Sequence, residues 1–94
     1  MNKLFKLAEQ YCNLLIKDCF GNYLIQYIFI QLKNKFQFNT LFPLIKKITE
    51  NIIYFCKDKY SSYVIEKIFE KGEEKIKEYL INYLFIKVSF RWNY

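Results

Sequence analysis

Apolar residues recur along the chain at steps of three and four positions, which is the pattern of helices that each bury one face. The segment 24–32 shows this well, with Leu24, Ile25, Ile28 and Phe29 on one side of a helix. Ile and aromatic residues favour strands locally, but the strict alternation of apolar and polar residues that a half-buried strand requires is missing. The pattern therefore predicts an all-α protein. About five helices are expected, at residues 3–17, 20–32, 41–57, 60–71 and 74–87.

Residues that favour helix ends place several of these boundaries. Asp18 and Asp58 each precede an apolar stripe, where a carboxylate accepts hydrogen bonds from free backbone N–H groups. Thr40, followed by Pro43, predicts the start of the third helix. Gly72 is expected to end the fourth helix in a left-handed backbone conformation.

The chain repeats itself at a spacing of forty residues. Residues 17–29 (KDCFGNYLIQYIF) and residues 57–69 (KDKYSSYVIEKIF) are identical at six of thirteen positions, where chance would give roughly one match. A weaker match at a spacing of thirty-six relates the segment 44–48 to the segment 80–84, so the extra residues are expected in a loop at 33–39. Helical units at this period indicate an α-solenoid, in which each repeat buries its apolar face against its neighbours.

Composition narrows the possible functions. The net charge of +6 is compatible with a polyanionic partner such as nucleic acid. The chain has no histidine, and Cys12, Cys19 and Cys56 form no CxxC pair, so a four-ligand zinc site is not expected. We expect no catalytic residues, metal or cofactor, and reduced, mostly buried cysteines. The longest apolar stretch, at 79–86, is interrupted by Asn82 and is too short to span a membrane.

Each repeat carries a distinctive polar pattern on its matched helix. Two polar residues lie four positions apart, and therefore one turn apart on the same face, with a tyrosine directly after the first of them. Such a pattern suits the reading of RNA at one base per repeat, with an aromatic ring for stacking and two side chains for the base edge. The candidate RNA-binding residues are Asn22, Tyr23, Gln26, Ser62, Tyr63 and Glu66.

The two polar pairs differ in chemistry. An ionised Glu66 only accepts hydrogen bonds, so it suits the N1–H and amino group of guanine. Asn22 and Gln26 both donate and accept, which matches the edge of uracil. A solvated helix face is the alternative interpretation of both pairs.

These residues resemble a known family. Residues 18–26 (DCFGNYLIQ) resemble the Pumilio (PUF) repeat signature D-x-[FY]-G-N-Y-V-I-Q, and residues 59–67 (KYSSYVIEK) resemble its variant K-[FY]-[AS]-S-x-V-[VI]-E-K. The resemblance covers roughly residues 4–86, and in order and type the segments resemble the sixth and seventh repeats of an eight-repeat domain. It implies a right-handed α-solenoid of Pumilio-type repeats, present here as a fragment or a shortened member. The repeats that the resemblance implies are a first at 1–36, a second at 37–74, and a partial third with an atypical tail at 75–94.

The resemblance also implies a function. The first polar pair would hydrogen-bond a uracil and the second a guanine, with the adjacent tyrosine stacking on each base. Because family members bind RNA antiparallel to the protein, the implied site is 5′-GU-3′ within a UGU core. The implied partner is single-stranded RNA in messenger RNA 3′ untranslated regions, with protein corepressors, in cytoplasmic control of translation and decay. No DNA or membrane partner and no enzymatic activity are expected. The alternative is a protein-binding α-solenoid without RNA specificity.

The short length has a structural consequence. Solenoids need about three repeats and polar caps at their ends. Leu7, Ile81 and Leu84 are therefore expected on exposed faces.

Overall fold

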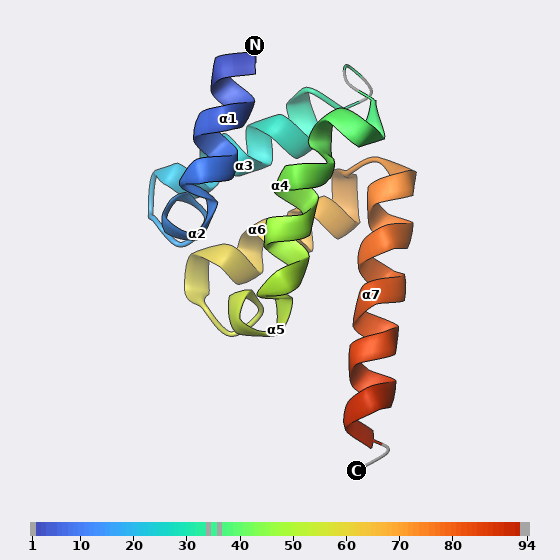
Figure 1. Ribbon diagram of the computed structural model, residues 1–94. Coiled ribbons are helices and arrows are strands. Elements are labelled where there is room, and N and C mark those ends of the chain that lie inside the picture. The colour runs from blue at the N-terminus through green and yellow to red at the C-terminus, as the bar shows by residue number, and fades with distance from the viewer. Residues whose placement is uncertain (1, 34, 36, 93–94) are drawn as a thin grey trace.

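The computed structural model describes residues 2–33, 35 and 37–92, and within these residues every regular element is helical. The elements are α1 (Asn2–Gln10), α2 (Cys12–Leu15), α3 (Gly21–Gln26), a π-helical turn η1 (Tyr27–Gln31), α4 (Phe38–Glu50), α5 (Ile52–Phe55), α6 (Lys59–Lys71) and α7 (Glu74–Trp92) (Figure 1). The prediction of an all-α protein is confirmed. Among the described helices, none combines the length and hydropathy that a membrane-spanning segment requires. The expected loop at 33–39 and the expected tail lie partly outside the described residues, at 34, 36 and 93–94.

Two of the predicted helices are broken one turn before their ends. Tyr11 separates α1 from α2, with φ −108° and ψ 17°. Asn51 separates α4 from α5 forty residues later, with φ −121° and ψ 23°. The same break at the same repeat position turns the chain toward the following helix in both repeats.

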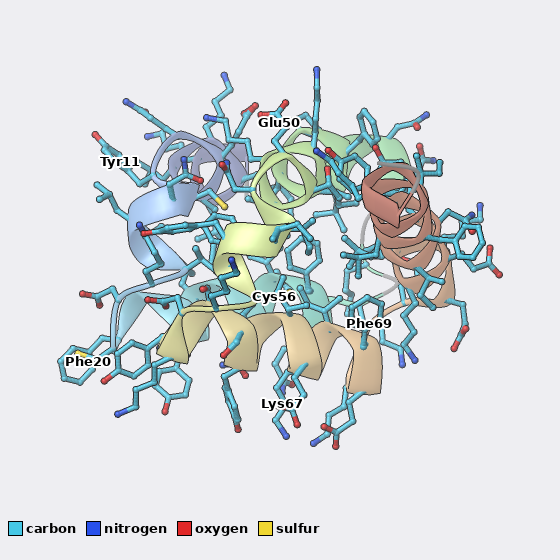
Figure 2. The ribbon with its side chains drawn as sticks, turned by 90° about the horizontal axis from the view of Figure 1, so that it is seen from below. Tyr11, Phe20, Glu50, Cys56, Lys67 and Phe69 are labelled. Carbon is cyan, nitrogen blue, oxygen red and sulfur yellow. The ribbon has the colours of Figure 1, made fainter. Side chains whose placement is uncertain are left out.

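The helices form two layers (Figure 2). In one layer α1, α4 and α7 run side by side in the same direction, and α4 packs against both of the others (Figure 1). In the second layer α6 packs against α3 and η1. Apolar side chains from both layers fill the space between them and are almost completely buried, among them Ala8, Ile25, Ile28, Phe29, Ile45, Ile48, Val64 and Ile68.

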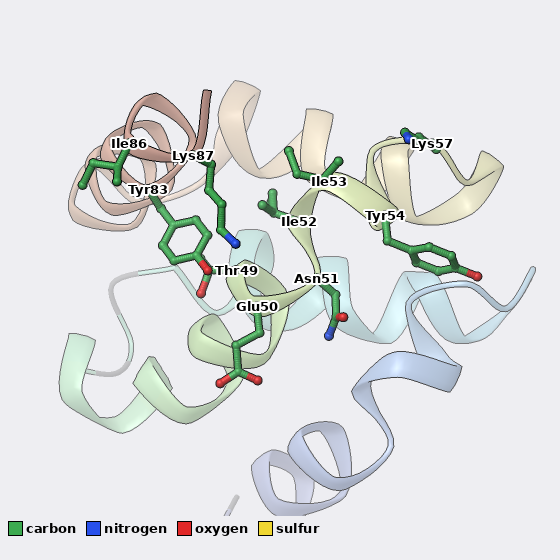
Figure 3. A pocket seen from close by; sticks show the side chains of 10 residues that line it. All are labelled: Thr49, Glu50, Asn51, Ile52, Ile53, Tyr54, Lys57, Tyr83, Ile86 and Lys87. Carbon is green, nitrogen blue, oxygen red and sulfur yellow. The ribbon is translucent and has the colours of Figure 1, made fainter. Parts of the chain in front are cut away.

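The outer helices at the ends of the stack expose apolar side chains. Leu7 on α1 is 52% exposed and Ile81 on α7 is 54% exposed, which confirms the sequence prediction, whereas Leu84 is half-buried. Phe85 is also exposed on α7. A pocket of about 740 Å³ lies between α7 and the α4–α5 segment, and Figure 3 shows the side chains that line it. None of the six candidate RNA-binding residues lines this pocket.

The predicted start of the third helix is wrong by three residues. α4 begins at Phe38, after Gln37 with extended backbone (φ −69°, ψ 151°), and Pro43 lies inside the helix. Phe38 packs against Phe42 one turn later and against Tyr79 of α7, with ring centroids 5.8 and 6.0 Å apart. These contacts extend α4 beyond the start that Thr40 would give.

The predicted left-handed conformation of Gly72 is also wrong. Gly72 follows α6 with φ −77° and ψ 178°, which is extended backbone. A Cβ atom at this position would lie 2.5 Å from the Ile68 carbonyl oxygen. Glycine is therefore required by close packing against the last turn of α6 rather than by a positive φ.

The cysteines differ in exposure. Cys12 is buried in the core, and burial raises the pKa of its thiol to about 11. Cys19 and Cys56 are exposed, so the prediction of mostly buried cysteines is wrong for two of the three. Cys56 occupies the repeat position of Ile16, which is fully buried. The two positions differ because α2 packs against α4, the long helix of the next repeat. The corresponding short helix, α5, is instead separated from α7 by the 740 Å³ pocket.

Candidate nucleic-acid interface

The candidate residues lie on α3 and α6, and an aspartate ahead of each helix accepts hydrogen bonds from two backbone N–H groups. Asp18 Oδ2 accepts hydrogen bonds from the backbone N–H groups of Phe20 (2.9 Å) and Gly21 (2.7 Å). Asp58 Oδ2 accepts from the N–H groups of Tyr60 and Ser61, both at 3.1 Å. The predicted contacts between these carboxylates and free N–H groups are therefore confirmed, although the N-cap residue is Asp58 for α6 and Phe20 for α3. They fix where each helix starts and thus the direction of every side chain in the next two turns.

The Asp18 and Asp58 carboxylates are stabilised in their charged form. The N–H groups of Gly21 and Phe20 lower the pKa of Asp18. The N–H group of Ser61 is the largest cause of the lowered pKa of Asp58. Both caps are consequently ionised at neutral pH.

A groove of about 310 Å³ lies between the exposed faces of α3–η1 and α6. Tyr23 and Gln26 line it from the first repeat, and Tyr63 lines it from the second. The two tyrosines are 62% and 44% exposed, so their rings are accessible to a ligand. The structure thus brings three of the six candidate residues, from neighbouring repeats, into one groove.

Asn22 does not reach this surface, because it is only 2% exposed. Its Nδ2 donates hydrogen bonds to the carbonyl oxygens of Asp18 (2.7 Å) and Cys19 (3.0 Å). Its Oδ1 accepts a hydrogen bond of 3.0 Å from Nε2 of Gln26. The expectation that each pair offers two side chains at the surface therefore fails for Asn22, whose polar atoms are bonded within its own repeat.

Ser62 and Glu66 lie beside the groove rather than in it. Neither residue lines the groove, although Gln26, at the repeat position of Glu66, does. The Ser62 hydroxyl donates a hydrogen bond of 3.1 Å to the Lys59 carbonyl oxygen, and Glu66 is exposed. Since the only proton of the hydroxyl is used by the backbone, the second pair offers hydrogen-bond acceptors alone to a ligand.

Sequence reasoning missed Lys67, which lines the groove together with Lys71. Lys67 Nζ lies 5.2 Å from the centre of the Tyr63 ring and 3.3 Å from a carboxylate oxygen of Glu70. The hydrogen bond to Glu70 is the largest cause of the raised pKa of Lys67, so the amine is charged at neutral pH. The spacing of Tyr63 and Lys67 by one helical turn is the signal that could have identified this residue.

The comparison with protein families agrees with the geometry. Residues 11–37 and 51–85 match the Pumilio-family RNA binding repeat, and together these segments cover more than half of the chain. No curated protein and no solved structure matches significantly. The matched segments contain α3 and α6 with all six candidate residues. This chain belongs to the Pumilio family of RNA-binding repeat proteins.

Proposed function

We propose that the chain binds single-stranded messenger RNA, reading 5′-GU-3′ of a UGU core. Its cellular role would be cytoplasmic control of translation and decay through 3′ untranslated regions, with protein corepressors as further partners. The observation that carries the proposal is the groove in which Tyr23 and Tyr63 of neighbouring repeats are both exposed beside Gln26. A base that enters this groove has an aromatic ring from each repeat within reach and an amide for its edge.

The second base position follows from the acceptors on α6. The Ser62 oxygen and the Glu66 carboxylate meet a ligand as acceptors only. Guanine presents two adjacent donors, N1–H and the exocyclic amino group, which suit this pair. Lys67 and Lys71 place positive charge beside the same surface, where phosphate oxygens are favoured.

The binding energy available to two repeats is small. Base stacking contributes about 1–3 kcal/mol per base, whereas association costs about 4–15 kcal/mol. Weak binding is therefore expected. It should strengthen at low salt, because phosphate contacts release counterions.

The test is a fluorescence-anisotropy titration at low salt with a UGU-containing RNA and a scrambled RNA of equal composition. We expect tighter binding of the UGU RNA, and weaker binding after Tyr23→Ala or Tyr63→Ala. Tyr11→Ala is the matched control, because Tyr11, between α1 and α2, does not line the groove and its exposure of 45% is close to that of Tyr63. Equal binding of both RNAs would reject the proposal and favour a protein-binding solenoid.

A further inference from the structure

We propose that the chain associates head to tail with a second copy of itself, so that the outer face of α7 in one copy packs against the outer face of α1 in the next. These faces lie at opposite ends of the layer that α1, α4 and α7 form (Figure 1). Leu7 on the outer face of α1 is 52% exposed, and Ile81 on the outer face of α7 is 54% exposed. This self-association needs no RNA.

The helix α4 shows how one outer helix packs against the next, because it has such a neighbour on each side. Toward α7, Phe38 and Phe42 both contact Tyr79, with ring centroids 6.0 and 5.6 Å apart. Ile45 lies on the same face of α4 by its helical spacing and is 1% exposed. The contact is therefore made by a row of three residues on α4 and by Tyr79 on the opposite helix.

The matching row on α7 is exposed. At the spacing of thirty-six residues that relates α4 to α7, the row recurs as Glu74, Glu78 and Ile81. All three side chains are exposed, and Glu74 remains 80% exposed although it contacts Lys77 of its own helix at 3.3 Å. Two carboxylates thus stand where α4 has two aromatic rings, beside an isoleucine whose equivalent on α4 is buried.

The outer face of α1 has the opposite charge. Tyr79 on α7 corresponds to Pro43 on α4 and, at the spacing of forty residues, to Lys3 on α1. Leu7 follows Lys3 after one helical turn, so the two residues share a face, and both are exposed. Where Tyr79 meets two phenylalanines within the chain, Lys3 of a second copy would therefore meet the two glutamates of α7.

The proposed contact joins two different faces, so a free α1 face and a free α7 face remain in every open dimer. Association then continues beyond two copies unless the stack closes into a ring. Because each copy contributes a single helix, the contact is small, and small interfaces bind weakly. The dilute chain is therefore expected to be monomeric.

The first test is sedimentation equilibrium of the full chain without RNA, from about 10 μM to about 1 mM, a range suited to weak interfaces. The average mass should rise with concentration. A monomeric mass throughout this range would overturn the proposal.

Two variants with the same substitution damage one face each. Leu7→Glu affects only the face of α1 and Ile81→Glu only that of α7, and each should weaken self-association at least about tenfold, because a carboxylate enters an apolar contact. Phe20→Glu is the matched control, because Phe20 lies between α2 and α3 and is 80% exposed. It should associate as the wild type does. Unchanged far-UV circular dichroism shows that each variant is folded.

A mixture of the two variants tests the head-to-tail arrangement. Leu7→Glu retains an intact α7 face and Ile81→Glu an intact α1 face, so an equimolar mixture should form heterodimers at concentrations where each variant alone is monomeric. A mixture that stays monomeric would overturn the proposal. Self-association of Leu7→Glu alone would show that α7 pairs with α7, and would also overturn it.

A charge exchange tests the register. Lys3→Glu should weaken association about two- to fivefold, as expected for a solvent-exposed ion pair. Adding Glu78→Lys to the same chain should restore the wild-type affinity, since the two charges again have opposite signs and the net charge is that of the wild type. Further weakening in the double variant would show that the two residues do not meet, which contradicts the proposed register.

Discussion

The Ser61 hydroxyl donates a hydrogen bond of 2.7 Å to the Phe55 carbonyl oxygen. The matching place in the first repeat has Gly21 against Leu15, where a Cβ atom would lie 2.8 Å from the Leu15 carbonyl oxygen. In both repeats the start of α3 or α6 therefore lies close to the end of the preceding short helix, α2 or α5. The residue at this close contact differs between the repeats. Ser61 adds a hydrogen bond, whereas Gly21 has no side chain.

This difference gives a prediction for Gly21→Ala. Glycine to alanine inside a helix normally stabilises a protein by about 1 kcal/mol, but the new methyl group here meets the Leu15 backbone, and such overpacking costs about 1–3 kcal/mol. We expect a lower free energy of unfolding, measured by urea denaturation. Asn82→Ala on the exposed side of α7 is the control and should not destabilise the chain. A stabilised Gly21→Ala variant would show that the two segments are not in close contact.

The capping carboxylates predict how stability depends on pH. Hydrogen bonds from Gly21 and Phe20 lower the folded-state pKa of Asp18, and a hydrogen bond from Ser61 is the main cause of the lowered pKa of Asp58. The unfolded chain therefore binds more protons in acid than the folded chain does. The contribution of both carboxylates to the free energy of unfolding is fully present above the ordinary pKa of 3.8. It is lost as the pH falls through the lowered pKa values of the folded state.

Thermal unfolding measured from about pH 6 to about pH 2 tests this sign. The double variant Asp18→Asn, Asp58→Asn should show a smaller fall in melting temperature with acid than the wild type, because asparagine caps a helix but does not titrate. Glu78→Gln removes an exposed carboxylate of α7 and should leave the pH dependence close to that of the wild type. An unchanged slope in the double variant would contradict the capping role.

The repeat architecture predicts that isoleucine-to-alanine substitutions at two matching positions, thirty-six residues apart, destabilise the chain to different extents. Ile45 on α4 is 1% exposed, because α1 and α7 flank that helix, whereas Ile81 on α7 is 54% exposed. Ile45→Ala should lower the free energy of unfolding by about 2–5 kcal/mol. Ile81→Ala should change it by less than about 1 kcal/mol. Equal losses at both positions, measured by urea denaturation, would mean that the exposed face of α7 is covered in solution.

Much of this fold is predictable from sequence, because the features that determine it lie close together along the chain and occur in both repeats. The sequence similarity between residues 17–29 and 57–69 predicts the repeat. Asp18 and Asp58 predict where α3 and α6 start, and the structure confirms their contacts with the backbone there. The breaks at Tyr11 and Asn51 were missed, since the apolar spacing continues through both of them.

The candidate site was only partly predictable, for a different reason. Spacing by four residues places Asn22 and Gln26 on one helix face, but it does not say how deep each side chain lies. Asn22 is buried because its amide donates hydrogen bonds to backbone carbonyl oxygens just before α3. The pattern of polar and apolar residues does not reveal such hydrogen bonds. Lys67 was missed because its role depends on the Tyr63 ring beside it.

Glu66 provides the most specific prediction for base recognition by the second repeat. Its carboxylate and the Ser62 oxygen offer only acceptors, because the Ser62 proton is donated to the Lys59 carbonyl oxygen. Glu66→Gln introduces an NH₂ group that can face the guanine donors, and hydrogen bonds to charged groups contribute about 1.5–3 kcal/mol. The preference for guanine at this base should therefore fall at least about tenfold in anisotropy titrations with RNAs that differ at this position only.

The control for Glu66→Gln must reproduce its change in net charge, because removal of a carboxylate strengthens RNA binding at any sequence. Glu78→Gln makes the same change on α7. It should tighten binding of all four RNAs alike and leave their order unchanged. Glu66→Gln should instead weaken guanine binding relative to the other bases, so a parallel shift in both variants would show that Glu66 acts only through its charge.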